Sequence, residues 1–299
     1  MLSEKTKQEA IKRATGLLII EAINSNPNGD PDHESDPRQR HDDRGEISPV
    51  SFKRKVRDLI HDKEGPVWLQ ISSSFSPPLT PDEYYILESR GRDRKTIEKE
   101  IKEDNGTLFV QKYWDGRVFG NTFLEEGAST SIKTGVVQFG LGVSIAPIRI
   151  ERMTNTNFAG VQEGKDRGMA PLGYRIVQHG VYCMPFFINP TAARKSGCEQ
   201  RDIDVLLKVI PHAYCHTRSY VRPFVGIRHA WYIEHKSPLG SCSDFALIAA
   251  LTPKKKSDPD TPSKSWEDYE VPTKLPEELK GKIASIRDLI ETADGTAGA

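Results

Sequence analysis

The chain has 299 residues and a formal net charge of zero, with 42 lysines and arginines balanced by 42 aspartates and glutamates. A charged fraction of 28% with 8% aromatic residues is that of a globular protein, which excludes wholesale disorder. The zero balance also excludes a uniformly basic surface for nucleic acid, although a local basic stripe is compatible with it.

No segment is apolar enough to cross a membrane, because the longest apolar runs, such as residues 16–20, fall far short of ~20 residues. Residues 1–16 lack the apolar core of a secretory signal, so we expect a cytoplasmic protein with no membrane partner. The cysteines form no CxxC pair, so we expect reduced, buried thiols rather than a redox centre. They are Cys183, Cys198, Cys215 and Cys242.

The first predicted element is a buried strand at residues 15–23, because the sequence TGLLIIEAI is apolar and rich in β-branched residues. Residues 24–31 are rich in asparagine, proline, glycine and aspartate, and this composition predicts a structured turn directly after the strand. A polar, acidic loop at residues 30–46 follows the turn.

A helix is predicted from Ser48, a good N-cap, and Pro49, which fits the first helical position. Apolar residues then recur at helical spacing, at Phe52, Val56, Leu59 and Ile60. We therefore expect one face of this helix to be buried and Lys53, Arg54 and Arg57 to project together from the opposite face.

Residues 70–106 are interpreted as an insertion that contains a solvated, highly charged helix at 92–104. Strands are expected at residues 136–144 and 145–152, followed by a long hairpin at about 150–179. A connection of that length is often functional in a compact domain.

Another helix is expected at residues 202–216, with an end or kink at Pro211, and further strands at 225–233 and 245–251. Residues 253–299 are predicted to form a flexible tether and an amphipathic helix at 276–291. The order of elements predicts an α+β fold over 14–252, an antiparallel sheet with helices on one face, of the βαββαβ ferredoxin-like type.

Common catalytic motifs such as Walker A, GxSxG and HExxH are absent. His212 and His216 lie at positions i and i+4 of a possible helix and could bind a metal, but no third ligand is evident nearby. We therefore expect no metal and no cofactor. The acidic loop is no EF-hand, because Ser35 and His41 stand where glycine and glutamate are needed. Asp30 could help to cleave RNA with a divalent ion, but hydrogen bonding within its own turn is favoured.

Nucleic-acid binding is the better-supported chemistry. The three basic residues of the predicted helix could contact successive phosphates, although such a cluster is often only a solvated face. In residues 217–232, Arg218 and Arg222 alternate with aromatic residues, which suits phosphate contacts with base stacking or an ordinary strand. Met169 in the long hairpin could wedge between bases or belong to the core.

The sequence NPNGDP at residues 26–31 follows an apolar strand, and KRKxR follows at 53–57. Together these motifs resemble the repeated backbone subunit of type I CRISPR interference (Cascade) complexes, within the RAMP superfamily and nearest to type I-C. Similar segments continue in the same order at residues 118–120, 135–138, 150–154, 167–169, 174–182 and 239–240.

The resemblance implies a modified RRM-like palm with a projecting thumb hairpin. Copies of such a subunit stack along the CRISPR RNA and leave most bases free to pair with a target DNA strand. The implied partners are CRISPR RNA, the target strand through guide pairing, neighbouring copies and other Cascade subunits, with no catalysis by this chain.

The resemblance also assigns roles by position. Lys53, Arg54 and Arg57 would contact RNA phosphates, and the hairpin residues Lys165, Arg167 and Met169 would belong to the thumb. The turn residues that would shape the palm edge are Asn26, Asn28, Gly29 and Asp30. The alternatives are a metal-dependent ribonuclease of the type III backbone kind acting through Asp30, an endonuclease that matures CRISPR RNA, and an RRM-like protein with another partner.

Overall fold

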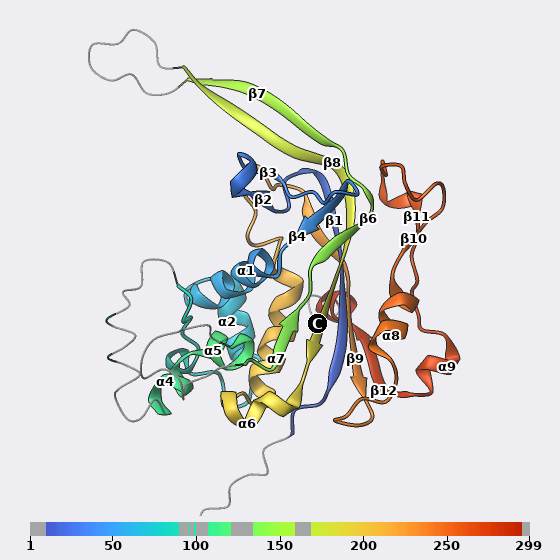
Figure 1. Ribbon diagram of the computed structural model, residues 1–299. Coiled ribbons are helices and arrows are strands. Elements are labelled where there is room, and N and C mark those ends of the chain that lie inside the picture. The colour runs from blue at the N-terminus through green and yellow to red at the C-terminus, as the bar shows by residue number, and fades with distance from the viewer. Residues whose placement is uncertain are drawn as a thin grey trace, which may run out of the picture.

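A computed structural model describes residues 10–89, 95, 99, 107–120, 134–158 and 169–294 of the chain. Within this part, eight strands form one antiparallel sheet, in which six lie in the order β12–β9–β1–β8–β6–β4 (Figure 1). The predicted combination of an antiparallel sheet with helices is confirmed. These six are β1 (Ala14–Ser25), β4 (Arg44–Ile47), β6 (Gly142–Pro147), β8 (Met169–Ile188), β9 (Val225–His235) and β12 (Ile283–Asp288), while β5 (Val137–Phe139) and β7 (Ile150–Phe158) also pair with β8.

Strand β1 lies at the centre of the sheet and is buried on both faces. Leu18 and Ile20 join one hydrophobic core, whereas Leu17 and Ile19 join a second core on the opposite face. Because side chains alternate across a strand, a strand covered on both faces reads as one continuous apolar run. The buried strand predicted at residues 15–23 is confirmed.

Helices cover the first face of the sheet, on the left in Figure 1. Ser48 caps α1 by accepting a hydrogen bond from the Ser51 N–H at 3.2 Å, and Pro49 follows as the first helical residue, as predicted. The buried Phe52 and Val56 attach α1 to the core. The helices of this part are α1 (Pro49–His61), α2 (Pro66–Ser73), α4 (Thr107–Lys112), α5 (Trp114–Phe119), α6 (Ala193–Ser196) and α7 (Gln200–Val209).

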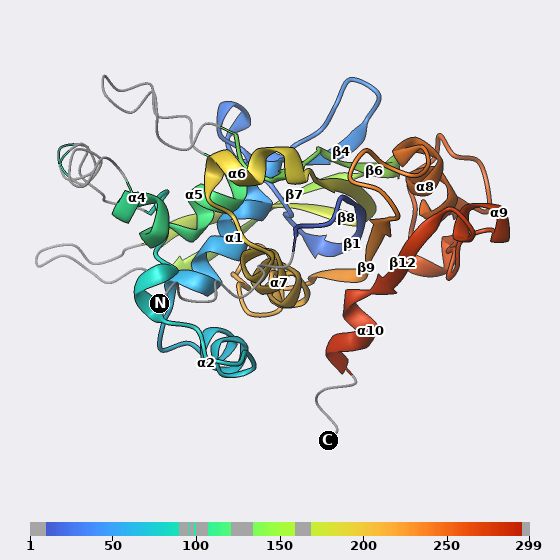
Figure 2. The same ribbon diagram turned by 90° about the horizontal axis from the view of Figure 1, so that it is seen from below.

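The C-terminal part covers the opposite face, so the expectation of helices on one face only is wrong (Figure 1, Figure 2). A helix, α8 (Asp244–Leu251), replaces the strand expected at 245–251. Its Leu247 and Leu251 pack against the side of the sheet that carries Leu17. Alanine and leucine favour a helix locally, and burial of these two leucines against the sheet completes it.

Residues 252–264 are not the flexible tether that the sequence predicts. Within them β10 (Lys254–Lys255) pairs with β11 (Tyr269–Glu270), and the buried Ser263 hydroxyl lies 2.7 Å from His179 Nδ1 on β8. Prolines exclude a regular helix here, but polar side chains bonded to the sheet hold the segment in place.

The amphipathic helix predicted at 276–291 divides into α9 (Glu277–Lys280), β12 and α10 (Leu289–Asp294). Strand β12 pairs with β9 at the sheet edge, and Asp288 accepts a hydrogen bond from the Ala230 N–H at 2.9 Å. Edge pairing thus overrides the helical pattern.

Strands β7 and β8 form a long hairpin that projects from the sheet (Figure 1). Pairing runs from Ile150 opposite Val177 to Phe158 opposite Met169. The charged helix expected at 92–104 falls almost entirely outside the described residues. Among the helices that are described, none has the length and hydrophobicity to span a bilayer.

Gly16 in β1 offers a test of this packing, because a Cβ built there would lie 2.0 Å from the buried Phe186 ring. We expect Gly16→Ala to lower the free energy of unfolding by about 1–3 kcal/mol through overpacking. Gly226→Ala in β9, with nothing within 4 Å of its Cβ, should change it by less than about 0.5 kcal/mol. Urea unfolding followed by circular dichroism measures both, and equal midpoints would show that Phe186 moves aside freely.

Candidate nucleic-acid interface

The turn after β1 is held by hydrogen bonds on every side. Asn26 donates its backbone N–H to the Val221 carbonyl at 2.7 Å and its side-chain amide to the Ser35 carbonyl at 2.8 Å. The Asn28 side-chain oxygen accepts from the Ser48 N–H at 2.7 Å. A Cβ at Gly29 would come within 3.2 Å of the Ser35 carbonyl oxygen. These residues therefore join β1, α1 and the segment at 217–224 at one place.

Asp30 lies in β2 (Gly29–Asp30) and caps the short turn that follows. Its carboxylate accepts from the Asp32 N–H at 3.2 Å and lies 3.0 Å from His33 Nδ1, with Arg38 3.6 Å away. The hydrogen bond with His33 holds the pKa of this carboxyl below its usual value. The favoured prediction, that Asp30 bonds within its own turn, is confirmed.

The basic residues of α1 do not form one exposed cluster. Arg57 is buried, with only 3% of its surface exposed, and its guanidinium contacts Asp115 at 2.8 Å and Glu88 at 3.0 Å. Arg54 donates to the Glu88 carbonyl. The expectation that Arg57 projects into solvent is wrong, because α5 packs over this side of the helix and brings Asp115 beneath the guanidinium.

Lys53 is half-buried, and its ammonium lies 5.0 Å from the centre of the Phe119 ring on α5. Burial, with the nearby positive charge of Arg57, lowers the pKa of Lys53. Among the described residues, Lys53 forms no ion pair. The Lys53 ammonium therefore remains available to an anion at the edge of the side of α1 that α5 covers.

Lys55 lies on a different side of α1, where its charge and that of Arg222 interact. It is 5% exposed, and its ammonium lies 5.2 Å from the centre of the Tyr214 ring. Burial and the charge of Arg222 lower the pKa of Lys55 to about 8. Arg222 donates to the Asn26 carbonyl at 2.7 Å, and neither cation forms an ion pair within the described part of the chain. The Asp58 carboxylate opposes this lowering only in part, so two cations that repel each other and form no ion pair in the described part make a site suited to an anion.

Two buried polar atoms near this pair also lack partners. The Tyr214 hydroxyl and the Asn26 side-chain oxygen have no hydrogen-bond partner among the described residues. The charge of Arg222 acts on the phenol of Tyr214, where burial nevertheless dominates and raises the pKa. Buried polar groups are normally hydrogen-bonded, so an unpaired hydroxyl beside two cations further supports an anion site.

Exposed aromatic rings lie beside these cations. Tyr220 is 58% exposed and Phe224 is 68% exposed. The Tyr220 ring packs on Tyr174 of β8, with 4.5 Å between ring centroids, and Arg218 nearby in the chain is exposed. The segment at 217–224 therefore presents apolar rings and positive charge at the base of the hairpin.

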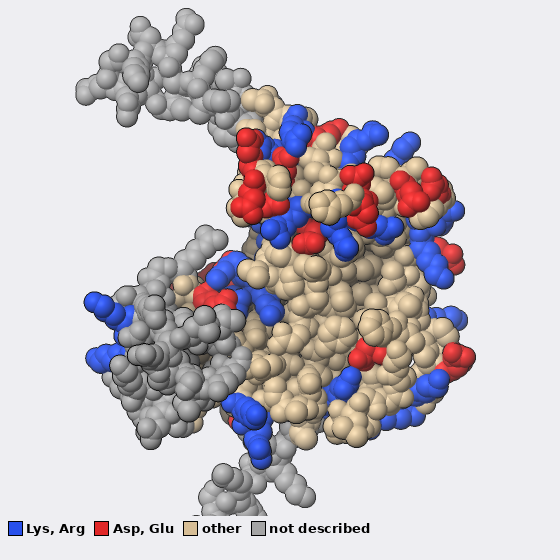
Figure 3. Space-filling view, viewed as in Figure 1, with Lys and Arg blue, Asp and Glu red and all other residues tan. Residues whose placement is uncertain are grey.

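Ion pairs fix the base of the hairpin to the loop after the turn. Arg152 of β7 binds the Asp36 carboxylate in β3 (Asp36–Pro37), and Arg175 of β8 binds Glu34 and lies 3.6 Å from Asp36. The bond with Arg152 holds the pKa of Asp36 below its usual value. Side chains of both charges crowd this end of the molecule, around β2, β3, β10 and β11 (Figure 3).

The remaining predicted residues lie in the hairpin. Lys165 and Arg167 fall outside the described residues. Met169 is the first residue of β8, where it pairs with Phe158 through the backbone. Sequence reasoning missed the importance of Lys55, although it stands within the same KRKxR motif.

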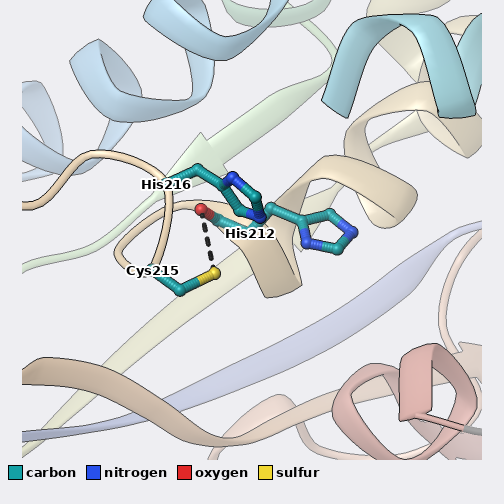
Figure 4. A group of neighbouring side chains, drawn as sticks. All are labelled: His212, Cys215 and His216. Carbon is teal, nitrogen blue, oxygen red and sulfur yellow. Dashed lines mark hydrogen bonds between the residues drawn. The ribbon is translucent and has the colours of Figure 1, made fainter. Parts of the chain in front are cut away.

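The structure also brings a third potential ligand to the predicted histidine pair. The ligand atoms of His212, Cys215 and His216 all lie within 4.8 Å of one another (Figure 4). The sequence-based expectation that no third ligand lies nearby is therefore wrong, since Cys215 directly precedes His216.

The family model for CRISPR-associated protein Cas7 matches residues 12–274. The chain belongs to this family. Among solved structures, this Cas7-family chain is similar to one described as "CRISPR RNA-guided surveillance complex, pre-nicking", with 15% identity, a TM-score of 0.49 and coverage of 82% of this chain and 83% of that chain. Another, described as "CRISPR RNA-guided surveillance complex", has 15% identity, a TM-score of 0.41 and coverage of 81% and 77%. No curated protein sequence matches the chain.

The Cas7 family match confirms the family indicated by the turn and the basic helix. It does not by itself divide the basic residues of α1 between stability and binding. The contacts distinguish them: Arg57 is paired with Asp115, whereas Lys55 forms no ion pair in the described part.

Arg57→Ala tests the structural half of this division. The substitution leaves Asp115 buried without its cation, so we expect the free energy of unfolding to fall by about 3–5 kcal/mol. Lys53→Ala, one turn earlier on the same helix, should cost less than about 1 kcal/mol. Urea unfolding measures both variants, and an unchanged midpoint for Arg57→Ala would contradict the assignment of Arg57 to stability.

Proposed function

We propose that this chain is the RNA-binding backbone subunit of a Cascade-type interference complex. Several copies bind along the spacer of a CRISPR RNA and present the guide for base pairing with a target DNA strand. The observation that carries the proposal is the buried Lys55, whose charge interacts with that of Arg222 while neither cation forms an ion pair in the described part of the chain. Membership of the Cas7 family supports it.

This geometry suits the sugar–phosphate backbone of RNA. A phosphate between Lys55 and Arg222 would receive charge-assisted hydrogen bonds and relieve the repulsion between the two cations. The exposed Tyr220 and Phe224 offer ring faces on which bases stack without regard to sequence. Phosphate contacts fix position but carry no sequence information, so the guide itself reads the target.

Other residues of the site take more specific roles. Lys53, Arg54 and the exposed Arg218 contact neighbouring phosphates, whereas Arg57 positions the helix through Asp115. Asn26, Asn28 and Gly29 shape the palm edge through their turn. Lys165, Arg167 and Met169 belong to the hairpin that reaches over the RNA as a thumb.

The palm is of the modified RRM-like kind. Its central strands lie in the order β9–β1–β8–β6, with α1 after β1 and α7 between β8 and β9, which is the arrangement of a βαββαβ unit. Neighbouring copies and other Cascade subunits, of type I-C in the nearest resemblance, complete the particle in the cytoplasm.

The role requires no catalysis and no cofactor. Asp30, the residue on which a metal-dependent ribonuclease would depend, uses its carboxylate to cap a turn and to bond His33. Coordination of a catalytic ion would have to displace these bonds. We therefore expect both the wild-type chain and Asp30→Ala to leave bound RNA intact in Mg²⁺.

Co-expression with the partner subunits and a CRISPR array tests the proposal. The wild-type chain should purify in a large particle that contains intact repeat–spacer RNA, as judged by light scattering, absorbance ratio and sequencing of the RNA. A particle without RNA, or a free monomer in the presence of all partners, would overturn the proposed function.

Lys55→Met and Arg222→Gln test the anion site itself. Each removes a charge and keeps much of the side chain, so we expect each to lower affinity for single-stranded RNA by about tenfold. Each should also reduce the slope of log K against log salt by about 0.7. Fluorescence anisotropy at several salt concentrations measures both quantities.

Lys280→Met is the matched control, because Lys280 is exposed on α9 and far from the site in the chain. Its affinity and salt slope should equal those of the wild type. If Lys55→Met and Arg222→Gln also behave as the wild type, the phosphate contacts lie elsewhere.

The lowered pKa of Lys55 predicts a pH dependence of RNA binding. Above pH about 8 the Lys55 side chain of the free protein loses its proton and becomes neutral. A bound phosphate favours the charged ammonium, so binding then requires uptake of a proton, and the affinity for RNA should fall as pH rises. The fall should approach tenfold per pH unit above that value. Lys55→Arg keeps its charge and should show a flatter profile, measured by anisotropy at constant ionic strength; parallel profiles would contradict this role of Lys55.

A further inference from the structure

The turn that follows α7 gathers three side chains that the RNA site does not use. His212 ends a short 3-10 segment, η6 (Ile210–His212), and Cys215 and His216 follow in the next turn. In Figure 4 the two imidazole rings lie side by side, and the Cys215 sulfur points to the His212 carbonyl. The ring centroids of His212 and His216 are 5.5 Å apart.

Backbone hydrogen bonds hold this turn in a helical course past Pro211. The His216 N–H donates to the His212 carbonyl at 3.2 Å, and the Thr217 hydroxyl donates to the Ala213 carbonyl at 2.5 Å. Side chains three and four residues apart lie on one side of such a turn. The HxxCH spacing therefore places two imidazoles and one thiol on one face, in a backbone already ordered without a metal.

The distances fit a small metal ion. Zinc binds nitrogen at about 2.0–2.1 Å and sulfur at about 2.3 Å, so tetrahedral geometry needs ligand atoms about 3.3–3.6 Å apart. The ligand atoms here lie within 4.8 Å of one another, and side-chain rotations close the difference. Cys215 gives up only weak contacts from its sulfur, at 3.5 Å to the His212 carbonyl and 3.8 Å to the Pro211 carbonyl.

We propose that His212, Cys215 and His216 form a three-ligand site for a divalent cation of the zinc class, with water in the fourth position. One sulfur and two imidazole ligands select zinc and similar first-row ions over magnesium and calcium. The Cys215 thiol releases its proton to solvent when the sulfur binds the metal.

The surroundings of the site favour approach of a cation from one side. His216 lines a cavity of about 330 Å³ with Asp58 and Asp62, which supplies negative charge and room for water. His212 lines a different cavity, where Asp204 is outnumbered by Lys208 and Arg287. The cation therefore enters beside His216, where Cys215 is also exposed.

A metal here would fix the chain immediately before the segment that carries Arg218, Tyr220 and Arg222. Only Thr217 separates the last ligand from Arg218. The site would thus restrain the start of this segment without contacting RNA.

Cobalt binding tests the proposal on the full-length chain, without a polyhistidine tag and without RNA. After removal of metal by a chelator, one equivalent of Co²⁺ should produce the ultraviolet charge-transfer band of a cobalt–thiolate bond and the visible bands of tetrahedral cobalt. Zinc should abolish both. A spectrum without the charge-transfer band would overturn the site.

Cys215→Ser should remove the charge-transfer band. His216→Gln should weaken zinc binding by more than about tenfold, because loss of a residue that only hydrogen-bonds a metal ligand already has an effect of about that size. Cys242→Ser, at a half-buried free cysteine elsewhere, is the control and should bind as the wild type. Wild-type zinc affinity in Cys215→Ser would overturn the proposal.

Alkylation of the wild-type chain gives a second measurement that needs no substitution. Zinc should protect Cys215 from iodoacetamide by at least about tenfold and leave the labelling of Cys242 unchanged. Equal labelling of Cys215 with and without zinc would count against the site. Because neither measurement uses RNA, failure here leaves the proposed RNA-binding function intact.

Discussion

The burial of β1 on both faces is the constraint on which the rest of the structure depends. Leu18 and Ile20 need a helical layer on one side, and Leu17 and Ile19 need cover on the other. The second cover comes from the C-terminal part, where α8 and the segments after it pack against the sheet. Residues that local patterns assign to a strand and a tether are thereby recruited to this layer, whereas those assigned to a helix are divided between it, the sheet edge and the first core. The same central strand ends at Ser25, so the turn that follows begins directly at the end of a strand buried on both faces.

The basic motif of α1 shows how packing gives neighbouring charges different roles. Arg57 is desolvated by α5, and a buried guanidinium is tolerated only with a partner, which Asp115 provides. Lys55, two residues earlier, lies over the Tyr214 ring and feels the charge of Arg222, and it forms no ion pair within the described part, although Asp58 acts on it from a greater distance. The buried positive charge of Lys55 is therefore unfavourable in the free protein, and the attraction of a bound phosphate would offset this unfavourable free energy. One member of the motif thus stabilises the fold, and another is the one we propose to bind an anion.

Local patterns were sufficient where the responsible interactions are local. The apolar run of β1 and the Ser48 cap of α1 follow from residues within one element, and both were predicted. The failures share a different cause. Helical spacing shows that Arg57 lies away from Phe52, but Asp115 stands 58 residues later in the sequence and decides whether that side is solvent. Strand β12 likewise depends on its pairing with β9, and the cysteine beside His216 became a ligand candidate only once the turn was seen to continue the helical course past Pro211.

The parts of the site are joined to one another more closely than their separation in the sequence suggests. Arg222 bonds the Asn26 carbonyl, Tyr220 stacks on Tyr174, and Arg152 binds Asp36. The first contact links the turn to the segment at 217–224, the second links that segment to the hairpin base, and the third links the hairpin base to the loop that follows the turn. Since the turn is anchored to β1 and the hairpin is the extension of β8, the distance between the cations and the hairpin base is set by the sheet. The repetition along RNA that we propose would need such a fixed distance, because any change in it would accumulate from one copy to the next.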